Sequence, residues 1–511
     1  MDLPNKLRTF TLEGTVFICG AMVMTFEIIG SRILSPYIGA STYVWTSLIG
    51  VILGSLSFGY WLGGRLADRK PDIKILSSVI FFAGGLIAIT VLVKEIVLSL
   101  VATAPVGIEL RSLIASILLF APASVALGIV TPYSIKLRLD SLSDTGKTVG
   151  RLYALSTIGS ILGTFAAGFL LIPFVGSLRT LYGIAGILIV VSIVLAPFSA
   201  TRRNLAVLII FAFSIVSSEV NAYILYRASD LYDIDTEYSR VQIFQTTDPK
   251  TGKPIRALAT DPYFTQSAMF LDSEEPALEY SRFYHLARHF SPDFAKVLVI
   301  GGAGYSVPKD FIRRYEDVKV DVVEIDPSMT AIARRFFRLE NNDRLRIVHE
   351  DARTFLNANK SGSYDVILMD AFGSLFTVPY QLTTIEAVRE ISRSLKDNGL
   401  VIINLGSALK GPGSEFLQAE LATYKSVFPQ VSVYKVNSEY EDERLQNLMI
   451  VATRSTQGQS YASPDPEMSQ LMQNRYVGDI PQTLPIITDD LAPVEFYNSI
   501  AQNRYLQERL K

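Results

Sequence analysis

Cysteine and histidine are scarce in this chain of 511 residues, and their scarcity excludes several kinds of site. Cys19 is the only cysteine, so the sequence excludes an internal disulfide and a zinc site built from clustered cysteines. The histidines are His285, His289 and His349. His285 and His289 would share one face of a helix, but no further ligands accompany them, so we interpret them as a surface pair and predict no metal site.

An excess of positive charge is also absent. The net charge is −2, which gives no indication of a nucleic-acid partner. Charged residues make up only 19% of the chain and the mean hydropathy is +0.30. These averages combine two unlike halves, because long apolar runs fill the chain up to about Tyr226 and charge returns to soluble levels after it. A chain of this length needs more than one core, so we expect a membrane half and a soluble half.

The apolar runs of the first half are long enough to cross a bilayer, because a span needs about 20 apolar residues. We expect spans at about residues 11–34, 43–64, 75–104, 112–135, 150–175, 180–199 and 204–226. The first run lacks a small-residue cleavage site and is followed by further runs, so it is not a signal peptide. Glycines at four-residue spacing predict close packing of the helices. These glycines are Gly50 and Gly54, Gly59 and Gly63, and Gly159 and Gly163.

Ionisable residues within the spans are Glu27, Arg32 and Glu219. Charges inside a membrane usually pair or line a cavity, so Glu27 belongs either to a polar site or to a structural interaction with Arg32. Basic residues after the second, fourth and sixth spans place those loops in the cytoplasm. Seven complete crossings would then put the C-terminal half outside. We expect residues 204–226 to cross only half-way or to lie at the interface, which keeps a nucleoside-using domain in the cytoplasm.

The soluble half is organised around residues 296–326. An apolar run, Val297 to Ile300, ends at the glycine turn Gly301-Gly302-Ala303-Gly304, and an amphipathic stretch leads to a second apolar run. Strand, turn, helix and strand form one βαβ unit, whose glycines let the backbone approach a ligand. Glu324 follows the turn by about 20 residues, where an acid binds ribose hydroxyls in a nucleoside site. The alternative is a Rossmann-like domain whose glycines only make a tight turn.

Acidic residues end three successive strands of this half: Glu324, Asp351 and Asp370. Alternating strands and helices predict a doubly wound parallel sheet, which binds ligands at the carboxyl ends of its strands. We therefore expect the glycine turn and the three acids to share one crevice. Glu324 would hold a ribose diol, Asp351 a purine amino group, and Asp370 an ammonium group or the proton of an attacking amine. Alternatively, Asp351 and Asp370 cap the helices that follow them.

The expected architecture has three parts. An all-α polytopic membrane bundle covers residues 1–226, a small β-subdomain with a linking helix covers 227–295, and an α/β Rossmann-like, nucleoside-binding domain covers 296–511. Alternating patterns predict strands at Tyr238–Ile243, Arg256–Thr260 and Ser267–Leu271 and a helix from Pro276 to Phe290.

Residues 239–405 resemble the spermidine synthases, which are polyamine aminopropyltransferases. The matching segments are SRVQIF, FTQSAMFLD, VLVIGGAG, VEIDP, VHEDARTFL and YDVILMDAF. The preceding bundle and the C-terminal LPIITDDLAPVEF are similar to the membrane-fused bacterial branch, which implies a multi-pass protein of the inner membrane. The resemblance also implies a homodimer and a methyltransferase-like fold.

The resemblance implies a site as well. In the family, an amine attacks decarboxylated S-adenosylmethionine and methylthioadenosine leaves. Asp370 would be the catalytic acid residue, and Tyr280 would lie near the reacting groups. The cofactor-binding residues implied are Gln242, Gln266, Gly301, Gly302, Gly304, Glu324, Asp351 and Asp370.

Two departures from the family concern the acceptor. The family turn reads GGGDGG, and Gly304 stands where its aspartate grips the aminopropyl ammonium; a second aspartate is missing from Ala371-Phe372-Gly373-Ser374. Each charge-assisted contact is worth about 1.5–3 kcal/mol, so we expect a weaker grip on a polyamine. Gly304 would leave room for the carboxylate of intact S-adenosylmethionine. Asp489 and Asp490 either replace the lost contacts or belong to a surface loop.

The leading hypothesis is a membrane-anchored aminopropyltransferase with an amine or polyamine acceptor. One alternative is a lyase or cyclising enzyme that needs no second substrate, and another is an S-adenosylmethionine-dependent methyltransferase. A third is a transporter-like bundle with a nucleoside-sensing domain, because residues 63–69, GGRLADR, resemble a loop of major-facilitator transporters.

Overall fold

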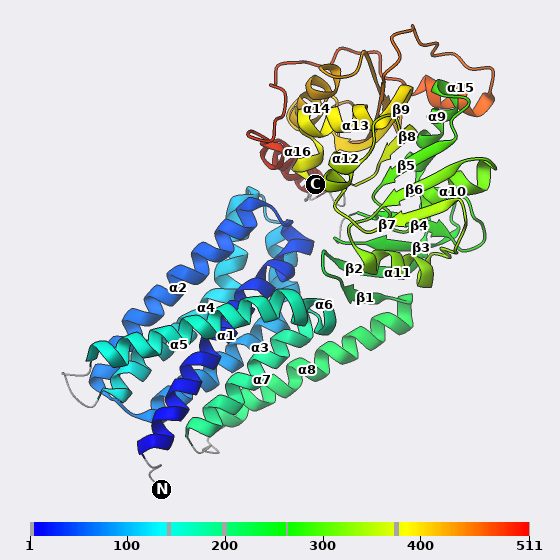
Figure 1. Cartoon of the computed structure of the whole chain (residues 1–511). Coiled ribbons are helices and arrows are strands. Elements are labelled where there is room, and N and C mark those ends of the chain that lie inside the picture. Colours follow the sequence, from blue (N-terminus) through cyan, green and yellow to red (C-terminus); the bar gives the residue numbers. More distant parts are fainter. Residues whose placement is uncertain (1–4, 140–144, 197–201, 262–263, 372–377, 510–511) are drawn as a thin grey trace. The chain divides into compact units, whose positions relative to one another are not determined.

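The computed structural model describes residues 5–139, 145–196, 202–261, 264–371 and 378–509. The chain forms two compact units, which are described separately below (Figure 1). One unit comprises Met1–Ala228 with Ile234–Arg240, and the other comprises Ser229–Asp233 with Val241–Lys511.

The first unit is built from long helices. They are α1 (Asn5–Ile38), α2 (Thr42–Arg69), α3 (Ile73–Ala102), α4 (Ile108–Arg138), α5 (Thr145–Ala166), a π-helical turn (Ala167–Leu171), α6 (Ile172–Val175), α7 (Ser177–Leu195) and α8 (Arg202–Ser229). Within the described ranges, 7 helical segments are long and apolar enough to cross a membrane, and they coincide with the predicted spans. Helix α8 runs without interruption for 28 residues, so its length allows a complete crossing, and the half-crossing remains a prediction.

Glycines set the closest helix contacts of this unit. A Cβ added at Gly59 of α2 would lie 2.4 Å from the Val125 carbonyl oxygen, and one at Gly159 of α5 would lie 2.1 Å from that of Phe17. The predicted packing role is therefore confirmed for these glycines and for their partners Gly63 and Gly163. It is wrong for Gly50 and Gly54, where an added Cβ meets nothing within 4 Å because both face away from the other described helices.

The ionisable residues of the spans have different surroundings. Glu27 is buried, with 8% of its surface exposed, whereas Glu219 is exposed. Arg32 donates hydrogen bonds to the carbonyl oxygens of Thr236, over 2.6 Å, and Glu237. Arg32 therefore ties the end of α1 to the segment Ile234–Arg240 of the same unit.

A four-stranded sheet with the order β1-β2-β3-β4 forms the predicted β-subdomain. Its strands are β1 (Tyr232–Asp235), β2 (Arg240–Thr247), β3 (Pro254–Ala259) and β4 (Ser267–Phe270). The helix predicted from Pro276 to Phe290 is wrong in type and extent. The chain instead makes a 3-10 helix, η3 (Glu279–Leu286), followed by the short α9 (Ala287–Phe290), because Tyr280 and Tyr284 are anchored at the end of a distant strand.

The second sheet has seven strands in the order β10-β11-β9-β8-β5-β6-β7. The strands are β5 (Lys296–Ile300), β6 (Lys319–Val323), β7 (Leu345–Val348), β8 (Tyr364–Met369), β9 (Leu395–Ser407), β10 (Gln430–Lys435) and β11 (Gln446–Thr453). Strands β7, β6, β5, β8 and β9 are parallel, as predicted, and β11 pairs antiparallel with both β9 and β10. The strand order reverses between β5 and β8, and such a switch point is where open α/β sheets bind ligands.

Helices cover both faces of this sheet (Figure 1). They are α10 (Ser306–Arg314), α11 (Pro327–Phe336), α12 (Ala352–Ala358), a 3-10 turn (Tyr380–Leu382), α13 (Ile385–Ser394), α14 (Glu415–Lys425), α15 (Pro466–Gln473) and α16 (Val494–Arg509). Alternate residues of each strand enter opposite cores, since Leu298 and Ile300 pack with α12 to α14 while Val297 and Val299 pack with η3 and α10. The predicted Rossmann-like, methyltransferase-type architecture is thereby confirmed.

Candidate active site

The glycine turn connects β5 to α10 and lies directly against the end of β8. Gly301 has φ +92°, and a Cβ added there would lie 2.4 Å from the backbone oxygen of Asp370. Ala303 and Tyr305 also have positive φ, at 44° and 54°. Left-handed backbone is rare for residues with a side chain, and it persists only where the surroundings hold it. The turn is therefore tightly constrained beside Asp370.

Glu324 follows β6 and binds the turn from the other side. One carboxylate oxygen accepts hydrogen bonds from the backbone N–H groups of Gly302, at 2.8 Å, and Ala303, at 3.2 Å. The other accepts from the N–H of Asp326 at 2.9 Å. Burial raises the pKa of Glu324, and the three backbone hydrogen bonds oppose that rise. Three accepted bonds leave part of the carboxylate's acceptor capacity for a ligand hydroxyl.

Asp370 is half-buried immediately after the last residue of β8. Tyr280 donates to one of its carboxylate oxygens over 3.0 Å, and the side-chain amide of Asn404 donates to the other over 3.3 Å. Burial raises the pKa of Asp370, while hydrogen bonds from Asn404, Tyr280 and Tyr284 hold it down in part. An oriented carboxylate with a raised pKa is the arrangement expected of a general base.

A cavity of about 310 Å³ opens beside Asp370 within the second unit. Gln266 and Tyr280, two of the predicted site residues, line it, and Asn404 forms part of its wall. A narrower space of about 10 Å³ shares Gln266, Tyr280 and Asp370 with it and is also bounded by Gly301 and Gly302. The turn and the predicted catalytic residue therefore meet at one hollow.

Other predicted residues lie outside these two cavities. Asp351 caps α12, accepting from the Thr354 N–H at 2.9 Å, which is the alternative considered for it. Asp489 pairs with Arg353 at 2.8 Å, and Asp490 is exposed beside it, as expected of a surface loop. Gln242 lies on β2, where its amide donates to Asp233 over 3.3 Å.

The room expected beside Gly304 is absent. Gly304 is buried, and a Cβ added there would lie 2.4 Å from the Ser267 hydroxyl oxygen and 3.1 Å from the Phe337 ring. The space that the missing side chain leaves is thus filled by β4 and by the end of α11, which pack against the turn. The expectation that a substrate carboxylate fits there is wrong.

Two residues at the site were not predicted. Asn404 lies near the end of β9, and its side-chain oxygen is buried without a hydrogen-bond partner among the described residues. The sequence does carry a signal for Asn404, because it is a polar residue near the carboxyl end of an apolar strand, and the same rule identifies Asp370. Tyr284 donates to the Met369 carbonyl over 3.0 Å and thereby secures the end of β8, a long-range contact that no local pattern indicates.

His285 is not the surface residue that its spacing from His289 suggested. It is buried, with its Nε2 2.6 Å from an Asp310 carboxylate oxygen and its Nδ1 2.8 Å from the Tyr315 hydroxyl. These contacts join η3, which carries Tyr280, to α10, which follows the glycine turn. The prediction was wrong because η3 turns His285 toward the core, whereas His289 remains partly exposed.

Comparison with known proteins shows which families this chain is similar to. Residues 278–455 match the family model of the spermine/spermidine synthase domain. A polyamine aminopropyltransferase of Vibrio vulnificus is 26% identical over 235 residues, covering 45% of this chain and 76% of that protein. Polyamine aminopropyltransferase 1 of Streptomyces coelicolor is 23% identical over 464 residues, covering 84% of this chain and 83% of that one. Because 464 residues exceed the second unit, this similarity extends into the helices.

Among solved structures, a probable spermidine synthase from Corynebacterium glutamicum is similar to this chain, with 22% sequence identity and a TM-score of 0.40. The aligned region covers 49% of this chain and 88% of that structure's chain.

Proposed function

We propose, from the premise that this chain is a transferase carrying a spermine/spermidine synthase domain, that it is a membrane-anchored enzyme of the aminopropyltransferase type. Its sulfonium substrate would be decarboxylated or intact S-adenosylmethionine, and its second substrate an amine. The observation that carries the proposal is the Asp370 carboxylate, which is fixed by Tyr280 and Asn404 beside the glycine turn and faces a cavity.

The reaction needs little covalent chemistry from the protein. The amine nitrogen attacks the carbon next to the sulfonium, a C–N bond forms, and the C–S bond breaks. Its electron pair stays on sulfur, so methylthioadenosine leaves as a neutral thioether. The new ammonium loses one proton to Asp370. Positioning the two substrates and accepting this proton are the protein's contributions, and a positioned base typically adds about 10²–10⁴-fold.

The nucleoside would lie across the glycine turn and the neighbouring strand ends. The unused acceptor capacity of Glu324 would take ribose hydroxyls, and the oxygen of Asp351 that does not cap α12 would take the adenine amino group. Gly301 and Gly302 allow the backbone to approach, and Gln266 lies beside the reacting groups. In this proposal Asp489 and Asp490 do not contact the substrates. Gln242 acts only by stabilising the β-subdomain.

The direct test is mass spectrometry of the products formed by the purified full-length chain. Decarboxylated and intact S-adenosylmethionine are each supplied with and without amines, to the wild type and to Asp370→Asn. We expect methylthioadenosine from the wild type and a loss of at least about 100-fold in the variant. Asp397→Asn is the control, since Asp397 is fully exposed and belongs to the same unit.

The two enzymatic alternatives each have their own signature in that test. Adenosylhomocysteine as product identifies a methyltransferase, and turnover without any amine identifies a lyase. Absence of methylthioadenosine from every mixture contradicts the proposed function.

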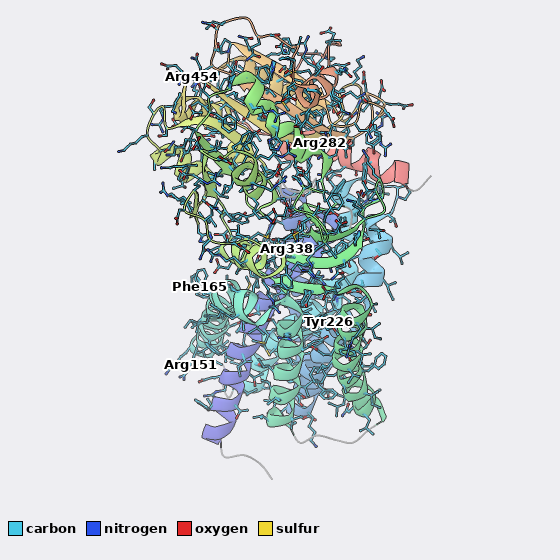
Figure 2. The ribbon with its side chains drawn as sticks, turned by 90° about the vertical axis from the view of Figure 1, so that its right-hand side faces the viewer. Arg151, Phe165, Tyr226, Arg282, Arg338 and Arg454 are labelled. Carbon is cyan, nitrogen blue, oxygen red and sulfur yellow. The ribbon has the colours of Figure 1, made fainter. Side chains whose placement is uncertain are left out.

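Membrane anchoring is proposed from the helical unit. Large apolar side chains stay exposed on its helices, including Phe165 and Tyr226, which are labelled in Figure 2. An apolar surface of this kind is unstable in water and matches the lipid hydrocarbon. We place the chain in a bacterial inner membrane with its catalytic domain in the cytoplasm. Because Cys19 is the only cysteine, Cys19→Ala gives a cysteine-free background. A single cysteine introduced near the C-terminus is then labelled from one side of the membrane or the other, which shows where the catalytic domain lies.

A further inference from the structure

The cavity beside Asp370 has an unusual balance of charge for a site that would take a polyamine. Among its described lining residues, Asp370 is the one acid and Arg444 the one base. Most of the other described lining residues carry aromatic or amide side chains, among them Phe264, Gln266, Tyr280 and Asn404. The two charged groups thus cancel, and the cavity offers one anionic contact and one cationic contact.

Arg444 is placed in the turn between β10 and β11. Its guanidinium carbon lies 4.0 Å from the centre of the Tyr440 ring, and its backbone oxygen accepts from the Gln446 side chain over 3.3 Å. Among the residues that the structure describes, no carboxylate lies within ion-pair distance of Arg444. Arg444 is exposed at the mouth of the cavity, so its guanidinium donors face solvent and are available to a ligand there.

This arrangement does not suit a diamine. One ammonium of a diamine would be attracted to Asp370, but no second acid lines the cavity for the other ammonium, and Arg444 would repel it. Acids of the same turn, Glu439 and Glu443, lie outside the lining. An amine that also carries a carboxylate would place its ammonium against Asp370 and its carboxylate against Arg444. A planar guanidinium binds a carboxylate through paired hydrogen bonds.

We propose that Arg444 binds a carboxylate of the substrate pair. This inference rests on the proposed function and names its substrate class. The carboxylate has two sources: an acceptor that is an amino-carboxylate, or an intact S-adenosylmethionine donor. In the first case an aminopropyl group passes to the amine of an amino acid, and in the second an aminocarboxypropyl group passes to the amine. In both, the C–S bond breaks toward methylthioadenosine and Asp370 takes the proton.

The test measures methylthioadenosine release by the wild type, Arg444→Gln, Arg444→Lys and a control. The control is Arg475→Gln, because Arg475 also stacks on a tyrosine, 3.8 Å from the centre of the Tyr461 ring, but does not line the cavity. Each protein is supplied with decarboxylated or intact S-adenosylmethionine, combined with putrescine, propylamine or γ-aminobutyrate. Thermal unfolding in detergent shows that each variant is folded.

For a carboxylate on the acceptor, we expect γ-aminobutyrate to exceed putrescine in kcat/KM with the decarboxylated donor, and Arg444→Gln to lower that value at least tenfold. For a carboxylate on the donor, we expect Arg444→Gln to raise KM at least tenfold for intact S-adenosylmethionine and to leave the decarboxylated donor unchanged. The kinetic constants of Arg444→Lys should lie between those of the wild type and of Arg444→Gln, and those of Arg475→Gln should match the wild type.

The opposite result is equally clear. The inference is overturned, and the proposed function left standing, if putrescine is preferred with the decarboxylated donor and Arg444→Gln changes neither kcat/KM for γ-aminobutyrate nor KM for intact S-adenosylmethionine. No methylthioadenosine from any mixture removes the proposed function, and the inference with it.

Discussion

Tyr280 donates a hydrogen bond over 3.0 Å to the carboxylate of Asp370, although 90 residues separate them in the chain. Burial, and next the negative charge of Asp370, raise the pKa of Tyr280 well above its usual value, so the phenol stays protonated and remains a donor. The same bond lowers the pKa of Asp370 against the rise that burial causes. Tyr280 is therefore expected to set the pH at which Asp370 can accept a proton.

Replacing Tyr280 by Phe should move the pH dependence of the reaction. Asp370 works as a base only when ionised, so the rate falls as the pH drops through its raised pKa. Loss of the Tyr280 bond raises that pKa further. The acid limb of kcat/KM should move upward by about one to two pH units, since a bond to a charged group is worth about 1.5–3 kcal/mol. The measurement is kcat/KM for methylthioadenosine release as a function of pH.

Tyr364→Phe is the matched control for this variant. Tyr364 begins the strand that Asp370 follows, and it donates a comparable bond to Asp321 over 2.8 Å at the far end of that strand. The Tyr364→Phe variant should leave the acid limb of kcat/KM at its wild-type pH. An equal movement in both variants would mean that Tyr280 acts only through general stability.

Gly301→Ala should be damaging for two separable reasons. The positive φ of +92° strains any residue with a side chain, at about 1–3 kcal/mol, and the new Cβ would lie 2.4 Å from the Asp370 backbone oxygen. Gly362→Ala is its control, because Gly362 has φ +64° with nothing within 4 Å of an added Cβ. We expect Gly362→Ala to lower only the midpoint of thermal unfolding and Gly301→Ala to lower it further and to abolish product formation. Similar losses of activity in both would contradict the close approach.

Glu324→Gln should weaken nucleoside binding. Both carboxylate oxygens accept backbone N–H bonds, from Gly302 and Ala303 on one side and from Asp326 on the other. A glutamine must place its amide N–H₂ against one of those donors, so at least one bond is lost. The loss is about 1–3 kcal/mol, or about 5- to 150-fold in the affinity for methylthioadenosine measured by calorimetry. The exposed acid Glu340 provides the control, and its Gln variant should bind normally.

Much of this fold follows from local patterns. The apolar runs predicted the long apolar helices. The strands around the glycine turn were predicted because an apolar strand, a turn and an acid follow one another in the chain. Asp370 was found by the same rule, as a polar residue at the carboxyl end of a buried strand.

What the sequence did not reveal depends on contacts between distant residues. Ser267 and Phe337 fill the space beside Gly304, and η3 replaces a helix because its tyrosines reach β8. Asp351 shows the limit of local reasoning, since its position after a strand fits both a ligand-binding residue and the helix cap that the structure contains.

The contact between His285 and Asp310 predicts a further effect, on stability. Burial alone would raise the pKa of Asp310, but the hydrogen bond and charge of His285, with Arg313 and Arg314, outweigh it and lower the pKa below the usual value of 3.8. A lowered carboxyl pKa adds stability above the unfolded value, and that stability is lost as the pH falls through the folded pKa. Asp310→Asn removes this contribution at all pH values.

We expect Asp310→Asn to lower the free energy of unfolding by about 3–5 kcal/mol near neutral pH, because it leaves buried donors unpaired. The difference from the wild type should shrink as the pH falls below the unfolded carboxyl value of about 3.9 and through the lowered pKa of Asp310, because the wild-type carboxyl then also becomes protonated. Thermal unfolding in detergent at several pH values measures both effects, with the exposed Asp397→Asn as control. A constant difference across this range would show that the Asp310 charge contributes nothing beyond its packing.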